Sequence, residues 1–222
     1  LDQLVDAELV FRRGLPPDAI YTFKHSLVQD AAYQSLLKST RTELHRRIAG
    51  TLEAHFPAII EGQPETVAHH YAEAGRPEAA VYWLRAGKLA AGRYAHLEAV
   101  AHLRRGLSSV GDLEDAAERD RLEIDLQTAL GMSLLATSGF AAPETGEAYA
   151  RAEQLCEATG ETSRVHAIRQ GLWNYHFVRG EVERRLAFLA PRGRRPARRA
   201  LRAGRQRLLE SLEQAHHVAA HL

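Results

Sequence analysis

The sequence has few of the residues and segments on which secreted and membrane-bound proteins depend. Its single cysteine, Cys156, cannot form an internal disulfide, and a lone thiol suits a reducing cytoplasm. No apolar run approaches the roughly 18 residues that a membrane-spanning helix requires. We therefore expect a cytoplasmic protein with no membrane partner, in which Cys156 is a small buried apolar side chain.

The common motifs of catalysis and nucleotide binding are also missing. There is no G-x-x-x-x-G-K-[ST], no G-x-G-x-x-G after a strand, no H-E-x-x-H and no C-x-x-C. His217 and His221 are four residues apart and could share a metal, but no third ligand is indicated. No nucleophile, base or carboxylate pair stands out. We expect no catalytic residue, no metal and no cofactor within this chain.

Acidic residues are absent from positions 184–207, which contain ten arginines. The rest of the chain holds 19 basic and 28 acidic side chains, so it is distinctly acidic. The stretch 189–207 lacks interleaved aromatic residues, and prolines interrupt its start. A solvated linker, a weak phosphate-binding segment and a shift of reading frame all remain open. We expect residues 184–222 to be an arginine-rich linker with part of a further helix, and nucleic acid to be an unlikely partner.

The ends of the chain indicate a piece of a longer protein. Residue 1 is leucine, and the single methionine is Met132. The last ten residues, EQAHHVAAHL, stop within a helical pattern.

Strand patterns are confined to the first 25 residues. VFRR, GLPPD and IYTFKH read as two short strands joined by a Gly-Pro turn, and residues 1–7 precede them as the end of a helix. A helix followed by such a two-stranded wing is the second half of a winged helix. We expect residues 1–38 to be the C-terminal part of a winged-helix domain.

Two helices with start signals come next. S-L-V-Q at Ser26 and T-R-T-E at Thr40 match the capping box, in which two side chains satisfy free backbone groups. Apolar residues then recur at i+4 spacing, which predicts two core-facing helices, the second ending at Pro57. These stripes are Val28, Ala32 and Leu36, then Leu44, Ile48, Leu52 and Phe56.

The remainder predicts an all-α fold. Helices are expected near 65–74, 77–92, 96–110, 115–137, 145–159 and 163–179, and short turns between them favour stacked helical hairpins. Small and large residues follow the spacing of a tetratricopeptide-like hairpin in two overlapping registers. These are Ala68, Tyr71, Gly75, Ala80, Leu84 and Gly87, and Trp83, Gly87, Ala99, Leu103 and Gly106. We expect residues 39–183 to form a divergent solenoid whose concave face binds a protein or peptide.

One histidine, His25, stands where the strands give way to helices. If Ser26 caps the helix, His25 lies one residue outside its N-terminus, where free N–H groups and the helix dipole favour an anion such as phosphate. The plain alternative is a histidine that merely ends a strand.

The stretch YTFKHSLVQDAAYQSLL resembles the end of the winged helix in signal-transduction ATPases with numerous domains, the STAND class. That class has a Met-His-Asp sequence here, and its histidine contacts the β-phosphate of bound ADP. His25 falls on this histidine, whereas Lys24 and Ser26 replace its neighbours. The following residues, through HLRRGL, are similar to bacterial members that carry tetratricopeptide-like repeats and often a class III adenylate/guanylate cyclase domain.

The resemblance implies a protein-interaction and sensor region of a multidomain signalling ATPase. ATP or ADP with Mg would bind a domain upstream in the parent protein, and that domain would be a partner in cis. The alternative function is a DNA-binding regulator that uses the winged helix and the arginine run. Near the wing this alternative has only Arg12, Arg13 and Lys24 as cations.

Overall fold

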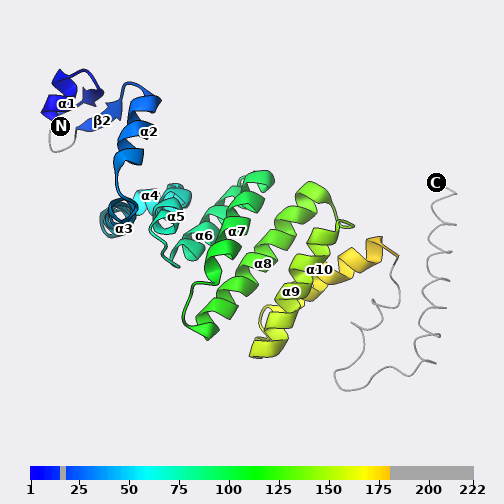
Figure 1. The fold of residues 1–222 in the computed structure, drawn as a ribbon. Coiled ribbons are helices and arrows are strands. Elements are labelled where there is room, and N and C mark those ends of the chain that lie inside the picture. Colours follow the sequence, from blue (N-terminus) through cyan, green and yellow to red (C-terminus); the bar gives the residue numbers. More distant parts are fainter. Residues whose placement is uncertain (16–18, 181–222) are drawn as a thin grey trace, which may run out of the picture.

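The computed structural model describes residues 1–15 and 19–180, which form an elongated molecule with a hairpin at one end and a row of helices behind it (Figure 1). The N-terminal unit, residues 1–35, contains four elements: α1 (Asp2–Asp6), β1 (Val10–Arg13), β2 (Ile20–Phe23) and α2 (Ser26–Ser35). Two connecting helices follow, α3 (Lys38–His55) and α4 (Pro57–Gly62). The helix row then consists of α5 (Pro64–Glu73), α6 (Ala79–Gly92), α7 (His96–Val110), α8 (Ala116–Ser138), α9 (Pro143–Thr159) and α10 (Val165–Val178).

The two predicted strands pair as an antiparallel hairpin. Val10 lies opposite Phe23 and Arg13 opposite Ile20. Val10 is the one buried residue of this pair of strands, while Phe11 and Ile20 are exposed. The hairpin therefore forms without a hydrophobic core of its own.

The starts of α2 and α3 differ from the sequence prediction. His25, in extended conformation, is the N-cap of α2, and Ser26 is already helical; no side chain caps the helix. Helix α3 begins at Lys38, so Thr40 lies inside its first turn and cannot act as a cap. A capping box needs a non-helical N-cap residue, which neither hydroxyl residue provides here.

The apolar stripes of these two helices are also less buried than predicted. Helix α2 buries no residue, and in α3 the buried residues are His45 and Ala49. Leu44, Ile48 and Phe56 are exposed. Pro57 begins a further short helix, α4, which the sequence pattern did not predict. Proline fits the first turn of a helix, because its missing N–H has no partner there in any case.

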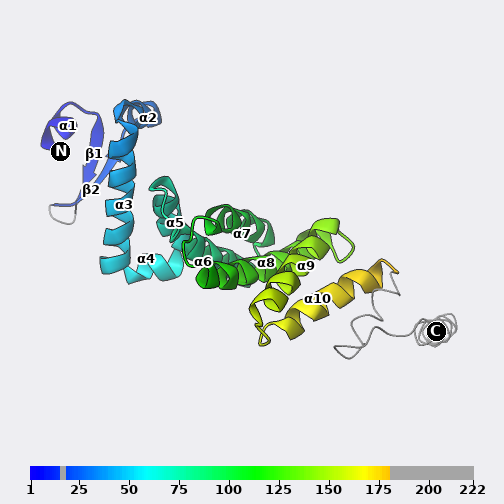
Figure 2. The same ribbon diagram turned by 60° about the horizontal axis from the view of Figure 1, so that its bottom comes forward.

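The helix row agrees with the predicted helices. Each of α5 to α10 packs against the next one along the chain, and α6 also contacts α8, as α8 does α10 (Figures 1 and 2). Helix α6 is buried on two sides. Its Tyr82 and Trp83 pack with α5, while its Ala80 and Leu84 belong to a second cluster with α7 and α8.

Small residues let these helices approach each other, as the sequence predicted. A Cβ on Gly87 would lie 2.5 Å from the Leu103 side chain, and one on Gly106 would lie 2.6 Å from Leu126. The Tyr149 ring occupies the space that a Cβ would need on either Gly131 or Gly171. Large side chains thus occupy positions that only glycine leaves open.

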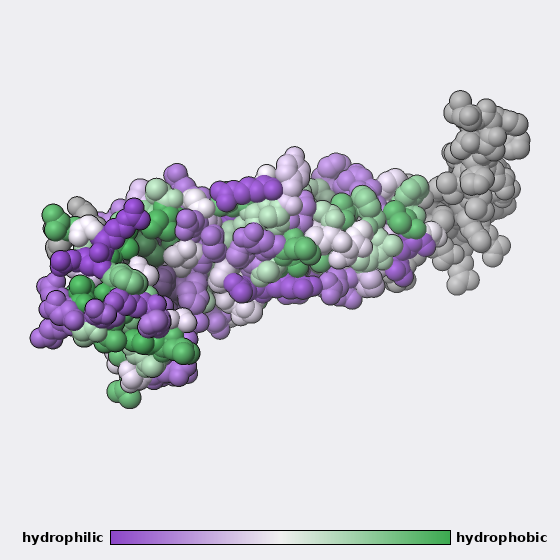
Figure 3. All heavy atoms as spheres, turned by 90° about the horizontal axis from the view of Figure 1, so that it is seen from above, coloured by the Kyte–Doolittle hydropathy of each residue, from purple (hydrophilic) through white to green (hydrophobic). Residues whose placement is uncertain are grey.

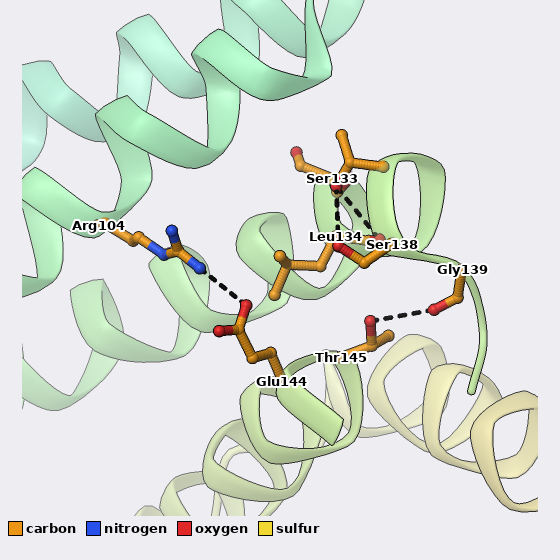
Figure 4. Close-up of polar contacts among 8 residues, drawn as sticks. Arg104, Ser133, Leu134, Ser138, Gly139, Glu144 and Thr145 are labelled. Atoms are coloured by element: carbon orange, nitrogen blue, oxygen red, sulfur yellow. Dashed lines mark hydrogen bonds and ion pairs between the residues drawn. The ribbon is translucent and has the colours of Figure 1, made fainter. Parts of the chain in front are cut away.

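Side-chain hydrogen bonds hold the connection from α8 to α9 in place. Gly139 ends α8 with a positive φ of 87°, and the Thr145 hydroxyl donates to its carbonyl at 3.3 Å (Figure 4). Across the same junction Arg104 of α7 donates to Glu144 of α9 at 2.7 Å. These contacts fix the first turn of α9 against its neighbours.

Candidate functional site

A groove opens between α6 and α8 on the helix row. It has a volume of about 510 Å³ and is lined by Lys88, Ala91, Gly92, His96, Asp125, Thr128, Ala129, Met132 and Ser133. The small residues on α6 leave the space open, and Met132 is 62% exposed at its side. An exposed flexible thioether beside small apolar residues suits contact with a partner's side chain.

The polar side chains that line the groove differ in whether they already have a hydrogen-bond or ion-pair partner. The Thr128 and Ser133 hydroxyls donate to carbonyls of their own helix, so their protons are already used. Asp125 pairs with Arg164 at 3.3 Å. Lys88 makes no ion pair with any residue that the structure describes, and His96 Nδ1 is buried without a hydrogen-bond partner there. The groove therefore offers apolar contacts beside the ammonium group of Lys88.

His25, the predicted phosphate contact, lies at the exposed N-terminus of α2. Its carbonyl accepts from the backbone N–H groups of Val28 and Gln29, at 3.1 and 3.3 Å. Its imidazole makes no capping hydrogen bond. The ring is thus at a helix N-terminus as predicted, although as the N-cap itself and not one residue before it.

Three histidines come together where α3 meets α5, and sequence reasoning missed this. His45 of α3 lies with its ring centre 5.7 Å from His69 and 5.0 Å from His70 of α5. The sequence showed the adjacent pair His69 and His70, but nothing in the spacing linked them to His45. The described residues contain no group of three potential ligands arranged to hold a metal ion.

A second polar cluster joins α3 to the helix row. Glu53 accepts hydrogen bonds from the hydroxyls of Tyr71 on α5 and Tyr82 on α6, the latter at 2.5 Å. These bonds, the Tyr71 one foremost, lower the pKa of the Glu53 carboxyl. Burial and the same carboxylate raise the pKa of Tyr82 to about 12. One carboxylate therefore ties three helices together.

Other predicted residues are placed as follows. Cys156 is buried, and burial raises the pKa of its thiol, which does not favour a nucleophile. Trp83 is buried in the core as predicted. The arginine run at 184–207 and the pair His217 and His221 lie outside the described residues. Among the helices that the structure describes, none is both long enough and apolar enough to cross a bilayer.

Comparison with known proteins gives one distant likeness. No protein-family model and no solved structure matches the chain. It is 27% identical over 175 residues to an uncharacterized protein of Rhizobium meliloti (strain 1021). The match covers 78% of this chain but 17% of the relative, so the chain spans about a sixth of that protein's length.

Proposed function

We propose that this chain is the protein-interaction and sensor region of a multidomain signalling ATPase of the STAND class. The observation that carries the proposal is the helix row, in which residues at tetratricopeptide spacing meet in pairs. Leu103 lies against Gly87, and Trp83 and Leu126 lie against Gly106. A solenoid built from such pairs presents an extended surface to a protein or peptide partner.

The partner surface of this proposal is the side formed by α6, α8 and α10. These alternate helices touch one another along the row, and in this proposal they form the inner side of the solenoid. The groove at Met132 opens between the first two of them. A partner helix or extended peptide would place an apolar side chain there, with Lys88 beside it.

The N-terminal unit and α3 support a second partner, an ATP-binding domain in cis. Hydrophobic surface is exposed at this end of the molecule (Figure 3). The exposed large apolar residues of this part include Phe11, Ile20, Leu27, Leu37, Ile48 and Phe56. Exposed apolar residues gathered on one part of a protein mark an interaction surface. In a longer protein the upstream domain would cover them, and His25 would then donate a hydrogen bond to an ADP phosphate.

The DNA-binding alternative receives less support from the same region. Arg12 pairs with Asp2 at 2.9 Å, and Lys24 pairs with Glu8 at 3.1 Å. Two of the three cations near the hairpin are thus partly neutralised, which weakens a phosphate-binding face.

The test has two arms. In the first arm, a photo-crosslinking amino acid replaces Met132 and should capture one defined protein in the cell that naturally makes this chain. The same photo-crosslinking amino acid in place of the exposed Gln154 on α9 should capture none.

In the second arm, His25→Ala in the longer protein should weaken ADP binding roughly tenfold, since a phosphate hydrogen bond is worth about 1–3 kcal/mol. His55→Ala is its control, an exposed histidine on α3. Equal crosslinking at both positions, together with unchanged ADP affinity, would rule out the proposal.

A further inference from the structure

The N-terminal unit is attached to the rest of the molecule by few polar contacts. Among the described residues, one side-chain hydrogen bond joins residues 1–35 to the helices that follow, from Tyr33 Oη of α2 to His45 Nε2 of α3 at 3.0 Å. Arg41 also lies over the Tyr33 ring at 5.1 Å. Since α2 buries none of its residues, its position depends strongly on this small set of contacts.

His45 also forms a hydrogen bond to the helix row. Its other nitrogen, Nδ1, lies 2.9 Å from Nδ1 of His70 on α5. The three side chains Tyr33, His45 and His70 therefore form a continuous hydrogen-bonded chain, which we call the histidine latch. His45 is 8% exposed, so water does not readily replace these bonds.

The bond between two ring nitrogens restricts how many protons the latch can hold. One nitrogen must donate an N–H and the other must accept it with a lone pair. Two neutral rings satisfy this, and so does one imidazolium facing one neutral imidazole. When both rings carry a second proton, two N–H groups face each other and the bond is lost, whichever tautomers are present at the start. Repulsion between the two charged rings would then turn His45 away from His70 and move its Nε2 away from the Tyr33 hydroxyl, which is the bond that holds the N-terminal unit.

The charged groups around the latch come from all three helices packed there. Glu73 on α5 favours protonation of both rings, whereas His69 disfavours it, and Asp30 of α2 and Arg41 of α3 line the same hollow. Burial is the largest influence and lowers the pKa of both His45 and His70. An opened latch would expose both rings to water and let them take up protons more readily, so acid favours opening.

Space for movement lies directly beside the latch. A hollow of about 750 Å³ separates α2 from α3 and α5, and Leu36, Leu44 and Ile48 form part of its wall. Helix α2 can therefore change its angle to α3 without first breaking a packed core.

We propose that the His45–His70 pair is an acid-sensitive latch that fixes the N-terminal unit to the helix row while at least one ring is neutral and releases it when both rings are protonated. This inference concerns the joint between the two parts and does not depend on which partner either part binds. It gives the joint two positions whose balance follows pH through the protons that the pair binds.

Distance measurement by electron spin resonance tests the latch in the full 222-residue chain. Spin labels would be attached at Leu27→Cys on α2 and Leu97→Cys on α7, both 79% exposed, while the native Cys156 stays because it is buried. At about pH 7.5 we expect one narrow distance distribution. At about pH 5 we expect its width to grow about twofold or more, as released conformers appear.

Three variants decide whether the histidine pair is responsible. In His70→Asn an amide stands near the former Nδ1 and can donate or accept, so the distribution should stay narrow at about pH 5. Tyr33→Phe removes one hydroxyl and should give a broad distribution at both pH values. His55→Asn, at an exposed histidine further along α3, should behave as the unchanged protein.

A distribution that is the same at both pH values in the unchanged protein would overturn the proposal. So would equal broadening in the unchanged protein and in His70→Asn. Circular dichroism at both pH values separates release of the joint from unfolding, because release leaves the helix content constant.

Discussion

Residues 1–56 and the helix row use similar apolar residues at similar spacings, yet they bury them very differently. Leu103, Ile124 and Ile168 of the row are completely buried, whereas Leu27 and Leu37 of the first part are largely exposed. The helical period defines which face of a helix is apolar, but burial requires a second surface to cover that face. The row supplies this surface from its own neighbouring helices. Among the described residues of the N-terminal unit, Val10 alone is buried.

The largest expected difference in stability comes from shortening one leucine side chain to alanine in each part. Leu103→Ala should lower the free energy of unfolding by about 2–5 kcal/mol, because it removes a fully buried side chain and leaves a cavity. Leu44→Ala should cost less than about 1 kcal/mol, since Leu44 is exposed. Urea unfolding of both variants measures the difference. Similar losses would mean that Leu44 is packed in solution.

Adding one methyl group at a glycine should have a smaller effect on stability, and the sign of that effect should be opposite in the two parts. Gly87→Ala places a Cβ 2.5 Å from Leu103 and should cost about 1–3 kcal/mol through overpacking. Gly50→Ala on α3 meets nothing within 4 Å and should stabilise the helix by about 0.5–1 kcal/mol. Thermal unfolding of the two variants gives the signs directly. A stabilising Gly87→Ala would show that α6 and α7 are further apart than described.

The smallest effect concerns Glu53, where the two parts meet. Glu53→Gln should cost about 1 kcal/mol at neutral pH, because two hydrogen bonds to a carboxylate become neutral ones. The pKa of Glu53 is lowered on folding, so its stabilising contribution is present above its ordinary value of about 4.5 and is lost as pH falls through the folded pKa. The cost of the substitution should therefore shrink below about pH 4.

Urea unfolding at about pH 7 and about pH 3 measures this change, and Glu61→Gln on the exposed side of α4 is the matched control. A cost that is independent of pH would show that the Glu53 carboxylate is not the group being titrated.

The sequence predicted the helix row well because local signals and packing agree there. Positive-φ glycines end α8 and α9, and the close approach at Gly87 followed from residue size and spacing. The sequence prediction failed where burial and helix starts depend on the neighbouring elements. The described residues leave the apolar stripe at Leu44 and Ile48 partly exposed. The capping signals at Ser26 and Thr40 are not used, because the N-caps of the two helices are His25 and Leu37, one and three residues earlier.

The histidine cluster could not have been predicted in the same way. His45 and His70 are 25 residues apart, and they meet because α4 turns the chain so that α5 lies against α3. That turn depends on a short helix beginning at Pro57, which the sequence pattern presented as an end. Contacts between elements require the angle of each connection, and the apolar period carries no information on such angles.

The double burial of α6 limits how this protein can be rearranged. Repeat proteins commonly gain and lose whole hairpins by recombination, since each hairpin carries its own pair of faces. Here one helix provides Tyr82 and Trp83 to the cluster before it and Ala80 and Leu84 to the cluster after it. A crossover on either side of α6 would separate one of these sets from its partners. An exchange of helical hairpins is therefore expected to preserve α5 to α8 as one inherited block.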